Sequence, residues 1–399
     1  MQRILYIQYT NPGSYPPLQH SSHIFAESGW AVRFLGIESE GAAEKLELRP
    51  HPNIQEQKWS RYAPGLLQKA HYVGFGIWAA WNILRWQPQW IYASDPLICP
   101  IALALSYLPR VHFIYHEHDS PPDNNKPGRT LYERFGLWTR RLLARRAELC
   151  ILPNEDRCEV FSRSTATRRP VQCVWNCPDL SEVIEIPKPA VNGPLRLYYH
   201  GTIVPCRLPF TTLEAMAMAP RGIKLSIVGY EPNGYVGYVE RLEQEAKRVG
   251  VGSQFHYLGP LPSRRDMLSV CRNSDVGIAL MPMRNGDLNE SSMAGASNKP
   301  FDYLSCGLAL LVSDLPEWKK MFVKPGYGLA CNPEDPESIA KALRWFAEHP
   351  TETRMMGERG RQRILCEWNY QAQFAPVLEA IQRLTIHPLS SRSQTGLPR

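Results

Sequence analysis

The residues of this sequence best suited to chemistry begin at Ser297–Glu317, SNKPFDYLSCGLALLVSDLPE, where a lysine stands at the start of a predicted helix. Ser297 or Asn298 can cap that helix, because a side-chain oxygen accepts a hydrogen bond from a free N–H group of the first turn. Helix N-termini attract anions, and Lys299 adds a positive charge at the same point. Asp302, one turn later, can accept hydrogen bonds from vicinal hydroxyls such as those of a ribose. Lysines are usually solvated, but this combination predicts a nucleoside-diphosphate site.

Three apolar runs in the same half of the sequence each end at a glycine. Gly201 lies in YYHGTIVPCRLP, Gly229 in LSIVGYE and Gly259 in FHYLGPLP. A glycine at a strand end lets backbone N–H groups approach a phosphate, and an arginine such as Arg207 can hold two of its oxygens. Each segment alone is more typical of a turn. The predicted donor-binding residues are Gly201, Thr202, Gly229, Gly259, Pro260, Leu261, Ser297, Asn298 and Asp302.

In the N-terminal half, HEHD at His116–Asp119 is the segment whose side chains are best suited to chemistry. A His-x-His pair followed by an acid can bind a metal. Alternating residues of a strand point to opposite faces, however, so these side chains cannot share one ion unless the backbone bends. We therefore predict no metal site, although a zinc hydrolase built on this segment is the interpretation that elemental analysis would test.

The segment Thr10–His20, TNPGSYPPLQH, follows the first predicted strand and is expected to be a loop bordering a ligand cleft. Gly13 allows close backbone approach, and Ser14 lies beside it. Tyr15 and His20 are candidates for contact with an acceptor. An ordinary proline-rich surface loop has the same composition.

The elements that must position these residues alternate between strand and helix. Such alternation predicts parallel, doubly wound sheets, in which ligands bind beyond the carboxyl ends of the strands. A proline- and glycine-rich linker, Pro187–Pro194, divides the chain in two. We predict an α/β protein of two Rossmann-like domains facing across a cleft, with residues 1–190 binding the acceptor and 191–368 the nucleotide. A C-terminal helix, 369–386, is expected to pack on the N-terminal domain, followed by a disordered tail, 387–399.

The length and composition of the chain agree with a folded two-domain protein. A chain of 399 residues is longer than a protein with a single hydrophobic core normally is, and 44% of its residues are hydrophobic. Ten scattered cysteines form no CxxC pair, so we expect free thiols and no zinc site. A net charge of +7 fits phosphorylated ligands or an anionic surface but not a dedicated nucleic-acid binder. Without a recognisable leader or a sufficiently long apolar run, we expect a soluble cytoplasmic protein.

Taken together, the glycine segments, SNKPFDYLSCGLALLVSDLPEW and GYGLACNPEDPESIAKAL resemble the C-terminal half of glycosyltransferase family 4. The resemblance is strong over about Leu195–Ala347 and weaker in the N-terminal half, where YHEHDSP and ILPNEDRCEVF match. It implies two facing Rossmann-like domains (the GT-B fold) and a retaining, metal-independent transferase. Family members read NK-x-F-E-Y where this chain has Asn298–Tyr303, so Asp302 takes the place of the ribose-binding glutamate.

The same resemblance implies a role for His118, which occupies the place of a histidine that faces the donor sugar. Glu117 and Asp119 would lie near it in the cleft. Members often carry a second acid where this chain has Ala294, and Glu290 is the nearest carboxylate. Thr202 stands where an arginine is common, which leaves Arg207 to bind the diphosphate with Lys299. We predict catalytic roles for His118, Arg207 and Lys299.

The residues and the resemblance together predict transfer of a sugar from a nucleotide diphosphate to a hydroxyl of a small-molecule, glycan or lipid-linked acceptor. The resemblance implies a UDP-sugar first and a GDP-sugar second. No cofactor is expected. A nucleotide-sugar 2-epimerase on the same fold, which would need carboxylates at the sugar, and a catalytically silent sugar-nucleotide-binding subunit are the alternatives.

Two helices bear on further partners. Arg129–Leu149 is rich in arginine, and Gly65–Trp86 contains Trp78, Trp81 and Trp86. Such helices can lie on an anionic membrane or meet a lipid-phosphate acceptor. A solvated basic face and a core helix would give the same pattern, and we prefer that interpretation.

Overall fold

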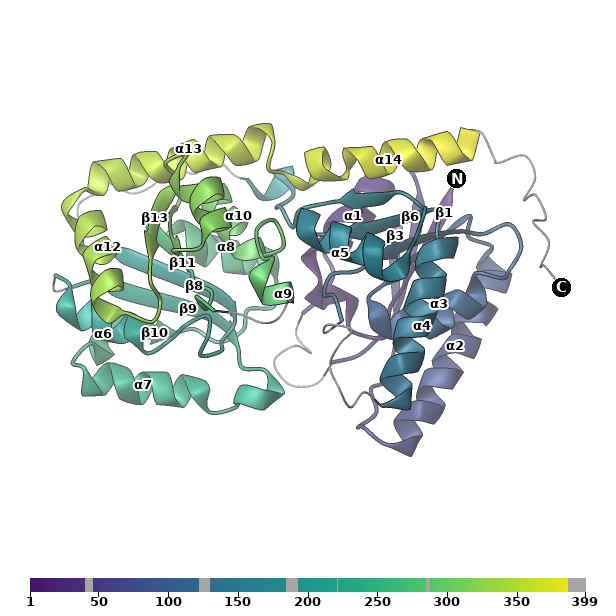
Figure 1. Ribbon diagram of the computed structural model, residues 1–399, viewed down its shortest axis with the longest axis horizontal. Helices are drawn as coiled ribbons and strands as arrows, with labels where there is room; N and C mark the ends of the chain where they lie inside the picture. The colour runs from purple at the N-terminus through teal and green to yellow at the C-terminus, as the bar shows by residue number, and fades with distance from the viewer. Residues whose placement is uncertain (40–45, 122–129, 184–192, 221, 285–287, 387–399) are drawn as a thin grey trace.

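The computed structural model describes residues 1–39, 46–121, 130–183, 193–220, 222–284 and 288–386. These residues form two parallel β-sheets flanked by helices, arranged side by side along the long axis of the molecule (Figure 1). The predicted disordered tail, 387–399, and most of the predicted linker lie outside the described residues.

The N-terminal sheet has the strand order β3-β2-β1-β4-β5-β6-β7, and its strands pair in parallel. The order reverses between β1 and β4, which is where doubly wound sheets bind ligands. The strands are β1 (Arg3–Ile7), β2 (Ala31–Ile37), β3 (Ile54–Trp59), β4 (Trp90–Ser94), β5 (His112–His116), β6 (Leu149–Leu152) and β7 (Val171–Cys173). The helices are α1 (Pro16–Glu27), α2 (Leu66–Trp86), α3 (Cys99–Leu105), α4 (Leu131–Arg146) and α5 (Glu155–Thr165).

The C-terminal sheet has the order β10-β9-β8-β11-β12-β13, and its order reverses between β8 and β11. Its strands are β8 (Arg196–Thr202), β9 (Lys224–Tyr230), β10 (Phe255–Tyr257), β11 (Val276–Ala279), β12 (Ala309–Ser313) and β13 (Gly328–Cys331). The helices are α6 (Thr211–Met218), α7 (Tyr238–Arg248), α8 (Arg264–Arg272), α9 (Leu288–Ser291), α10 (Asn298–Ser305), α11 (Pro316–Trp318), α12 (Pro336–Glu348), α13 (Pro350–Cys366) and α14 (Tyr370–Ile386).

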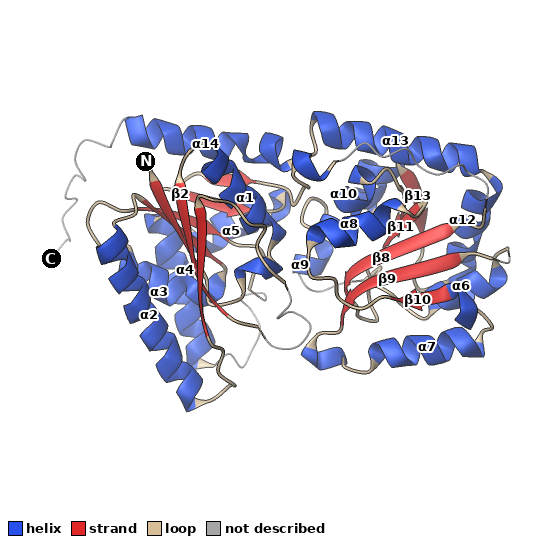
Figure 2. Ribbon diagram, turned by 180° about the vertical axis from the view of Figure 1, so that it is seen from behind, coloured by secondary structure: helices blue, strands red, loops and turns tan. Residues whose placement is uncertain are grey.

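Each sheet is buried on both faces, as the continuous apolar strands require. In β1, Leu5 and Ile7 pack into one core, while Ile4 and Tyr6 pack into another on the opposite face, because successive side chains alternate across a strand. The C-terminal sheet also separates two apolar clusters. Figure 2 shows helices on both sides of the two sheets. The predicted fold class is confirmed.

Helix α14 connects the two halves at the C-terminal end of the described chain. It continues from the direction of α13 across the top of the molecule (Figure 1) and packs on α1. Phe374 lies edge-on against Phe25, with ring centroids 5.8 Å apart, and the Tyr370 amide donates to the Pro178 carbonyl at 2.8 Å. The helix therefore belongs to the apolar core of the N-terminal sheet.

The structure corrects two local predictions. The segment expected to be a loop through His20 is helical from Pro16 onward, because prolines suit the first turn, where their missing N–H costs nothing. The strand expected to run to Asp119 ends at His116, so the last three residues of HEHD form a loop. Several elements were not predicted individually, namely strands β3 and β13 and helices α3, α5, α8, α9, α11 and α13.

Candidate active site between the two sheets

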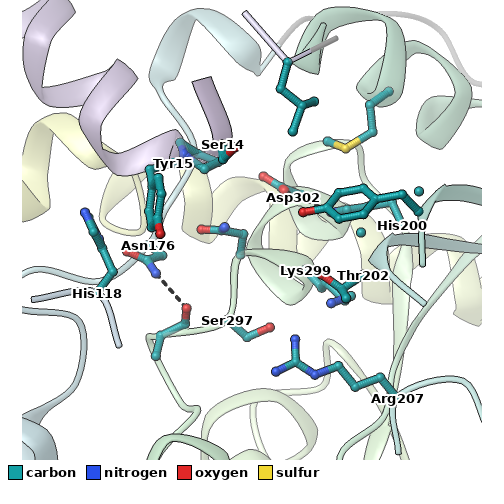
Figure 3. A pocket seen from close by; sticks show the side chains of 18 of the residues that line it. Ser14, Tyr15, His118, Asn176, His200, Thr202, Arg207, Ser297, Lys299 and Asp302 are labelled. Atoms are coloured by element: carbon teal, nitrogen blue, oxygen red, sulfur yellow. Dashed lines mark hydrogen bonds and ion pairs between the residues drawn. The ribbon is translucent and has the colours of Figure 1, made fainter. Parts of the chain in front are cut away.

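A cavity of about 590 Å³ lies between the carboxyl ends of the two sheets. The N-terminal half contributes the loop after β1 and the loop after β5, and the C-terminal half contributes the ends of β8 and β9 and the start of α10. Figure 3 shows Tyr15 and His118 on one side of it and Lys299 and Arg207 on the other. The predicted residues that line it are Gly13, Ser14, Tyr15, His118, Asp119, Gly201, Thr202, Arg207, Gly229, Pro260, Leu261, Glu290, Ser297, Asn298, Lys299 and Asp302.

Lys299 and Arg207 approach the cavity from separate segments of the C-terminal half. Lys299 lies in the first turn of α10, with its Nζ 5.4 Å from the ring centroid of Tyr199, and Arg207 follows β8. Burial, and then the positive charge of Arg207, lower the pKa of Lys299 to about 7. Two positively charged groups that influence each other in this way create a local demand for an anion. Ser297 is the N-cap residue as predicted, but its side chain makes no capping hydrogen bond.

Two glycines allow the backbone to line the same region. Gly201 and Gly229 have positive φ angles, of 102° and 151°. A Cβ on Gly229 would lie 1.9 Å from the Gly201 carbonyl oxygen, so only glycine fits where these two strand ends meet. A Cβ on Gly201 would lie 3.4 Å from Nζ of Lys299. A ligand can therefore approach the backbone directly beside the ammonium group.

Asp302 lines the cavity but is already engaged by two neighbours. Arg264 donates to it with Nη2 at 2.8 Å and Nη1 at 3.3 Å, and His200 Nε2 lies 3.2 Å from its Oδ2. Burial alone would raise the pKa of Asp302, but the charge of Arg264 and the hydrogen bond from His200 outweigh it and lower the pKa. Because a carboxylate offers about four acceptor positions, Asp302 retains room for about one ligand hydroxyl.

Arg264 extends this cluster across the molecule. Its Nε and Nη2 also donate to Glu182, at 2.8 and 2.9 Å. Burial opposes the ionisation of Glu182, but Arg264 and then His20 lower the pKa of this carboxyl well below its ordinary value. Glu182 follows β7 of the N-terminal sheet, so the chain of ion pairs joins the two halves beside the cavity.

Three predicted residues do not line the cavity. His20 is buried in α1 with its Nε2 3.3 Å from Glu182, because the helix that begins at Pro16 turns the ring inward. Glu117 is fully buried and accepts from Arg140 Nη2 at 2.7 Å and Tyr115 Oη at 2.8 Å. Gly259 contributes a backbone carbonyl that accepts from the Gly229 amide.

His118 faces the cavity in a form suited to neutral hydrogen bonding. Its backbone amide donates to Asp95, and its ring lies 5.0 Å from that of Tyr15. Within the described part of the chain, neither ring nitrogen has a hydrogen-bond partner, although both are buried. Burial lowers the pKa of His118 to about 3, so the ring is neutral near pH 7.

The HEHD side chains are therefore directed to different neighbours. His116 contacts the Tyr92 hydroxyl at 2.7 Å, and Glu117 pairs with Arg140. Asp119 is an exposed residue at the cavity edge, 4.0 Å from Arg157. Among the described residues, no three histidine, cysteine or acidic side chains gather as metal ligands would.

Polar residues of the N-terminal half bind the segment that leads into α10. Arg157 donates to the carbonyls of Asn289 and Ser292, at 2.6 and 3.1 Å. Asn154 and Asn176 donate to the carbonyls of Ala294 and Ala296, at 2.6 and 2.7 Å. These bonds hold the start of α10, and so Lys299, against the N-terminal half.

Sequence reasoning missed Arg157, Asn176, His200 and Arg264 as cavity residues. Their position at or just after a strand end, or at a helix start, is the sequence feature that could have identified them. Asn154 has such a position too, because it caps α5. The ILPNEDRCEVF motif was recognised, but no role was assigned to its asparagine or arginine.

Comparisons with known proteins support the architecture. Residues 211–379 match a family model described as glycosyl transferase-like. No curated protein matches the sequence. The structure is similar to that of HepE from Anabaena in complex with UDP and glucose, with 15% identity, a TM-score of 0.69 and coverage of 96% of this chain and 100% of that one.

Two further solved structures have the same arrangement. Sucrose-phosphate synthase from Thermosynechococcus elongatus gives 14% identity and a TM-score of 0.70 over 97% of this chain and 100% of that one. WaaG, described as a glycosyltransferase involved in lipopolysaccharide biosynthesis, gives 13% identity and a TM-score of 0.66 over 94% and 98%. At these identities the likeness establishes the fold, which is that of the GT-B glycosyltransferases.

Proposed function

We propose that this protein is a glycosyltransferase of family 4 that moves a sugar from a nucleoside-diphosphate donor to a hydroxyl group of an acceptor. The observation that carries the proposal is the pair Lys299 and Arg207 at one end of the interdomain cavity, beside the glycine-lined ends of β8 and β9. Such a site suits a diphosphate, which offers two adjacent negative groups to two cations. The HepE structures hold UDP and UDP-glucose, which favours uridine over guanosine as the donor base.

Charge stabilisation would be the main contribution to the rate. As the glycosidic bond to the diphosphate breaks, negative charge grows on the departing oxygen, and fixed cations that face it lower the barrier. Lys299 and Arg207 supply these cations, so the proposed reaction requires no divalent ion and no cofactor. Activity should survive treatment with a chelator.

The neutral ring of His118 lies across the cavity from these cations and would contact the donor sugar. One of its two unpartnered ring nitrogens can accept a hydrogen bond and the other can donate one, without adding a charge. Glu290, which lines the cavity, is the carboxylate proposed to meet the donor sugar. We propose that the anomeric configuration is retained, on the basis of the resemblance to family 4.

The ribose would bind beside Asp302, whose carboxylate is already contacted by Arg264 and His200. Asp302 has about one acceptor position left, and Arg264 uses four of its five N–H groups on Asp302 and Glu182. We propose that one ribose hydroxyl donates to Asp302 while the remaining Nη1–H of Arg264 donates to the nucleotide. We further propose that the reaction takes place in the cytoplasm.

A thermal-shift panel of UDP- and GDP-sugars tests the donor site, because a ligand that binds the folded state raises the melting temperature. The preferred donor should raise it, and Arg207→Ala and Lys299→Ala should each weaken donor binding and so reduce the rise. Product analysis with a sugar acceptor then separates the alternatives. An epimerase would release nucleotide without an acceptor, and a silent binding subunit would form no product even though the donor binds.

A further inference from the structure

Helix α2 presents an apolar stripe to solvent as well as one to the core. Its inner side buries Phe75, Ala79 and Ile83. Its outer side carries large apolar residues at helical spacing, namely Leu66, Val73, Ile77, Trp81 and Leu84, whose exposed fractions are 82, 61, 68, 54 and 65%. A surface helix of a globular protein normally places polar residues on the outer side. Among the residues that the structure describes, nothing covers these side chains on the outer side of α2.

Helix α4 continues this apolar surface. Leu131, Phe135 and Trp138 follow one another at helical spacing and are 82, 50 and 55% exposed. The two helices lie in the same corner of the molecule in both views (Figures 1 and 2). The two helices are close to each other at Tyr72 of α2 and Tyr132 of α4. Burial, and then this neighbouring Tyr132, raise the pKa of Tyr72. Ten of the twenty large hydrophobic side chains exposed in the described structure lie on these two helices, so the surface is a patch and not a scatter.

The charges around the patch have one dominant sign. Helix α2 contains Lys69 and Arg85 and no acidic residue. Helix α4 adds the exposed Arg134, Arg141 and Arg145. Its one acidic residue, Glu133, accepts hydrogen bonds from Thr130 as part of the helix cap.

We propose that this α2–α4 face binds the surface of an anionic lipid bilayer. The face comprises Leu66, Val73, Ile77, Trp81, Leu84, Leu131, Tyr132, Phe135 and Trp138 with Lys69, Arg85, Arg134, Arg141 and Arg145. Apolar and aromatic side chains enter the boundary between headgroups and acyl chains, while the cations meet lipid phosphates. No described helix is long and apolar enough to cross a membrane, so the contact is peripheral. The proposal is independent of the reaction assigned to the cavity.

Flotation with vesicles tests this binding directly. Wild-type protein should float with vesicles of phosphatidylcholine and phosphatidylglycerol, and less with phosphatidylcholine alone. The double variant Ile77→Ser/Trp81→Ser should bind about tenfold more weakly or worse, because two large apolar groups no longer enter the boundary. Arg134→Gln/Arg141→Gln should weaken binding to the anionic vesicles by about fivefold for each arginine removed. For the wild type, 0.5 M salt should weaken binding in the same way.

The matched control is Val236→Ser/Met355→Ser, which removes two apolar side chains that are 76 and 53% exposed in the C-terminal half. It should float like the wild type, and circular dichroism should show that every variant is folded. The proposal is overturned if the wild type does not float, or if Ile77→Ser/Trp81→Ser floats equally well. A dimer in light scattering that this variant dissociates would assign the face to a second copy and also overturn it.

Discussion

Lys299 should take up a proton when a nucleotide diphosphate binds. Burial and Arg207 hold its pKa at about 7 in the free protein, against an ordinary value of about 10.4. A diphosphate beside Nζ places negative charge against the ammonium group, which favours the protonated form and raises the pKa again. Binding at or above pH 7 therefore requires a proton from solution.

The size of the effect follows from the lowered pKa. With a pKa of about 7, Lys299 is about half protonated at pH 7 and about one-tenth protonated at pH 8, so binding should take up about 0.5 and 0.9 protons respectively. By linkage, the affinity should fall about tenfold between pH 6 and pH 8. The donor should be UDP-glucose, because its diphosphate does not titrate in this range.

Isothermal titration calorimetry at pH 8 in two buffers of different ionisation enthalpy measures the proton uptake. Lys299→Met should abolish both the uptake and the pH dependence, while Lys224→Met, which removes an exposed lysine on β9, should keep both. An uptake near zero in the wild type, or an unchanged uptake in Lys299→Met, would refute the placement of the diphosphate against Lys299.

Three further predictions concern the structure around the cavity. Arg264→Met should lower the free energy of unfolding in urea by about 3–5 kcal/mol, because Asp302 and Glu182 lose their shared partner; a loss no larger than that of the exposed Arg248→Met would contradict this. Gly229→Ala should abolish the thermal shift by the donor, since its Cβ would meet the Gly201 carbonyl, whereas Gly234→Ala, with open space around it, should retain the shift. Burial raises the pKa of Asp95 to about 7, so its contribution to stability is fully present below about pH 4 and is lost as the pH rises through about 7. Asp95→Asn should therefore reduce the fall in unfolding free energy between pH 4 and pH 8 by an amount on the order of 2–4 kcal/mol, and an unchanged profile from urea titrations would disprove this assignment.

The fold was largely predictable because buried parallel strands leave uninterrupted apolar runs in the sequence. Two of the elements that escaped prediction, β3 and α13, lack that signal. Strand β3 lies at the sheet edge with mostly polar side chains. Helix α13 contains Gly357 and Gly360, which lower helix propensity. A Cβ on Gly357 would lie 2.0 Å from the Gly307 carbonyl, so tertiary packing determines why glycine stands there.

The candidate site was predictable only in part. Lys299 and the strand-end glycines can be identified from short stretches of sequence. The helix cap and the charge lie within a few residues of each other at Lys299, and each glycine directly follows an apolar run. The cluster of His20, Glu182 and Arg264 does not, since Glu182 and Arg264 are 82 residues apart and meet only through the packing of the two halves. His20 was assigned to the cleft because the helix start at Pro16 was missed, and that start turns its ring toward Glu182.

A crystal structure with UDP-glucose bound would test the central claim most directly. The account predicts diphosphate oxygens within about 2.7–3.2 Å of both Lys299 Nζ and an Arg207 guanidinium nitrogen, with the sugar directed toward His118. A nucleotide bound elsewhere, or a diphosphate in the cavity that touches neither cation, would contradict it.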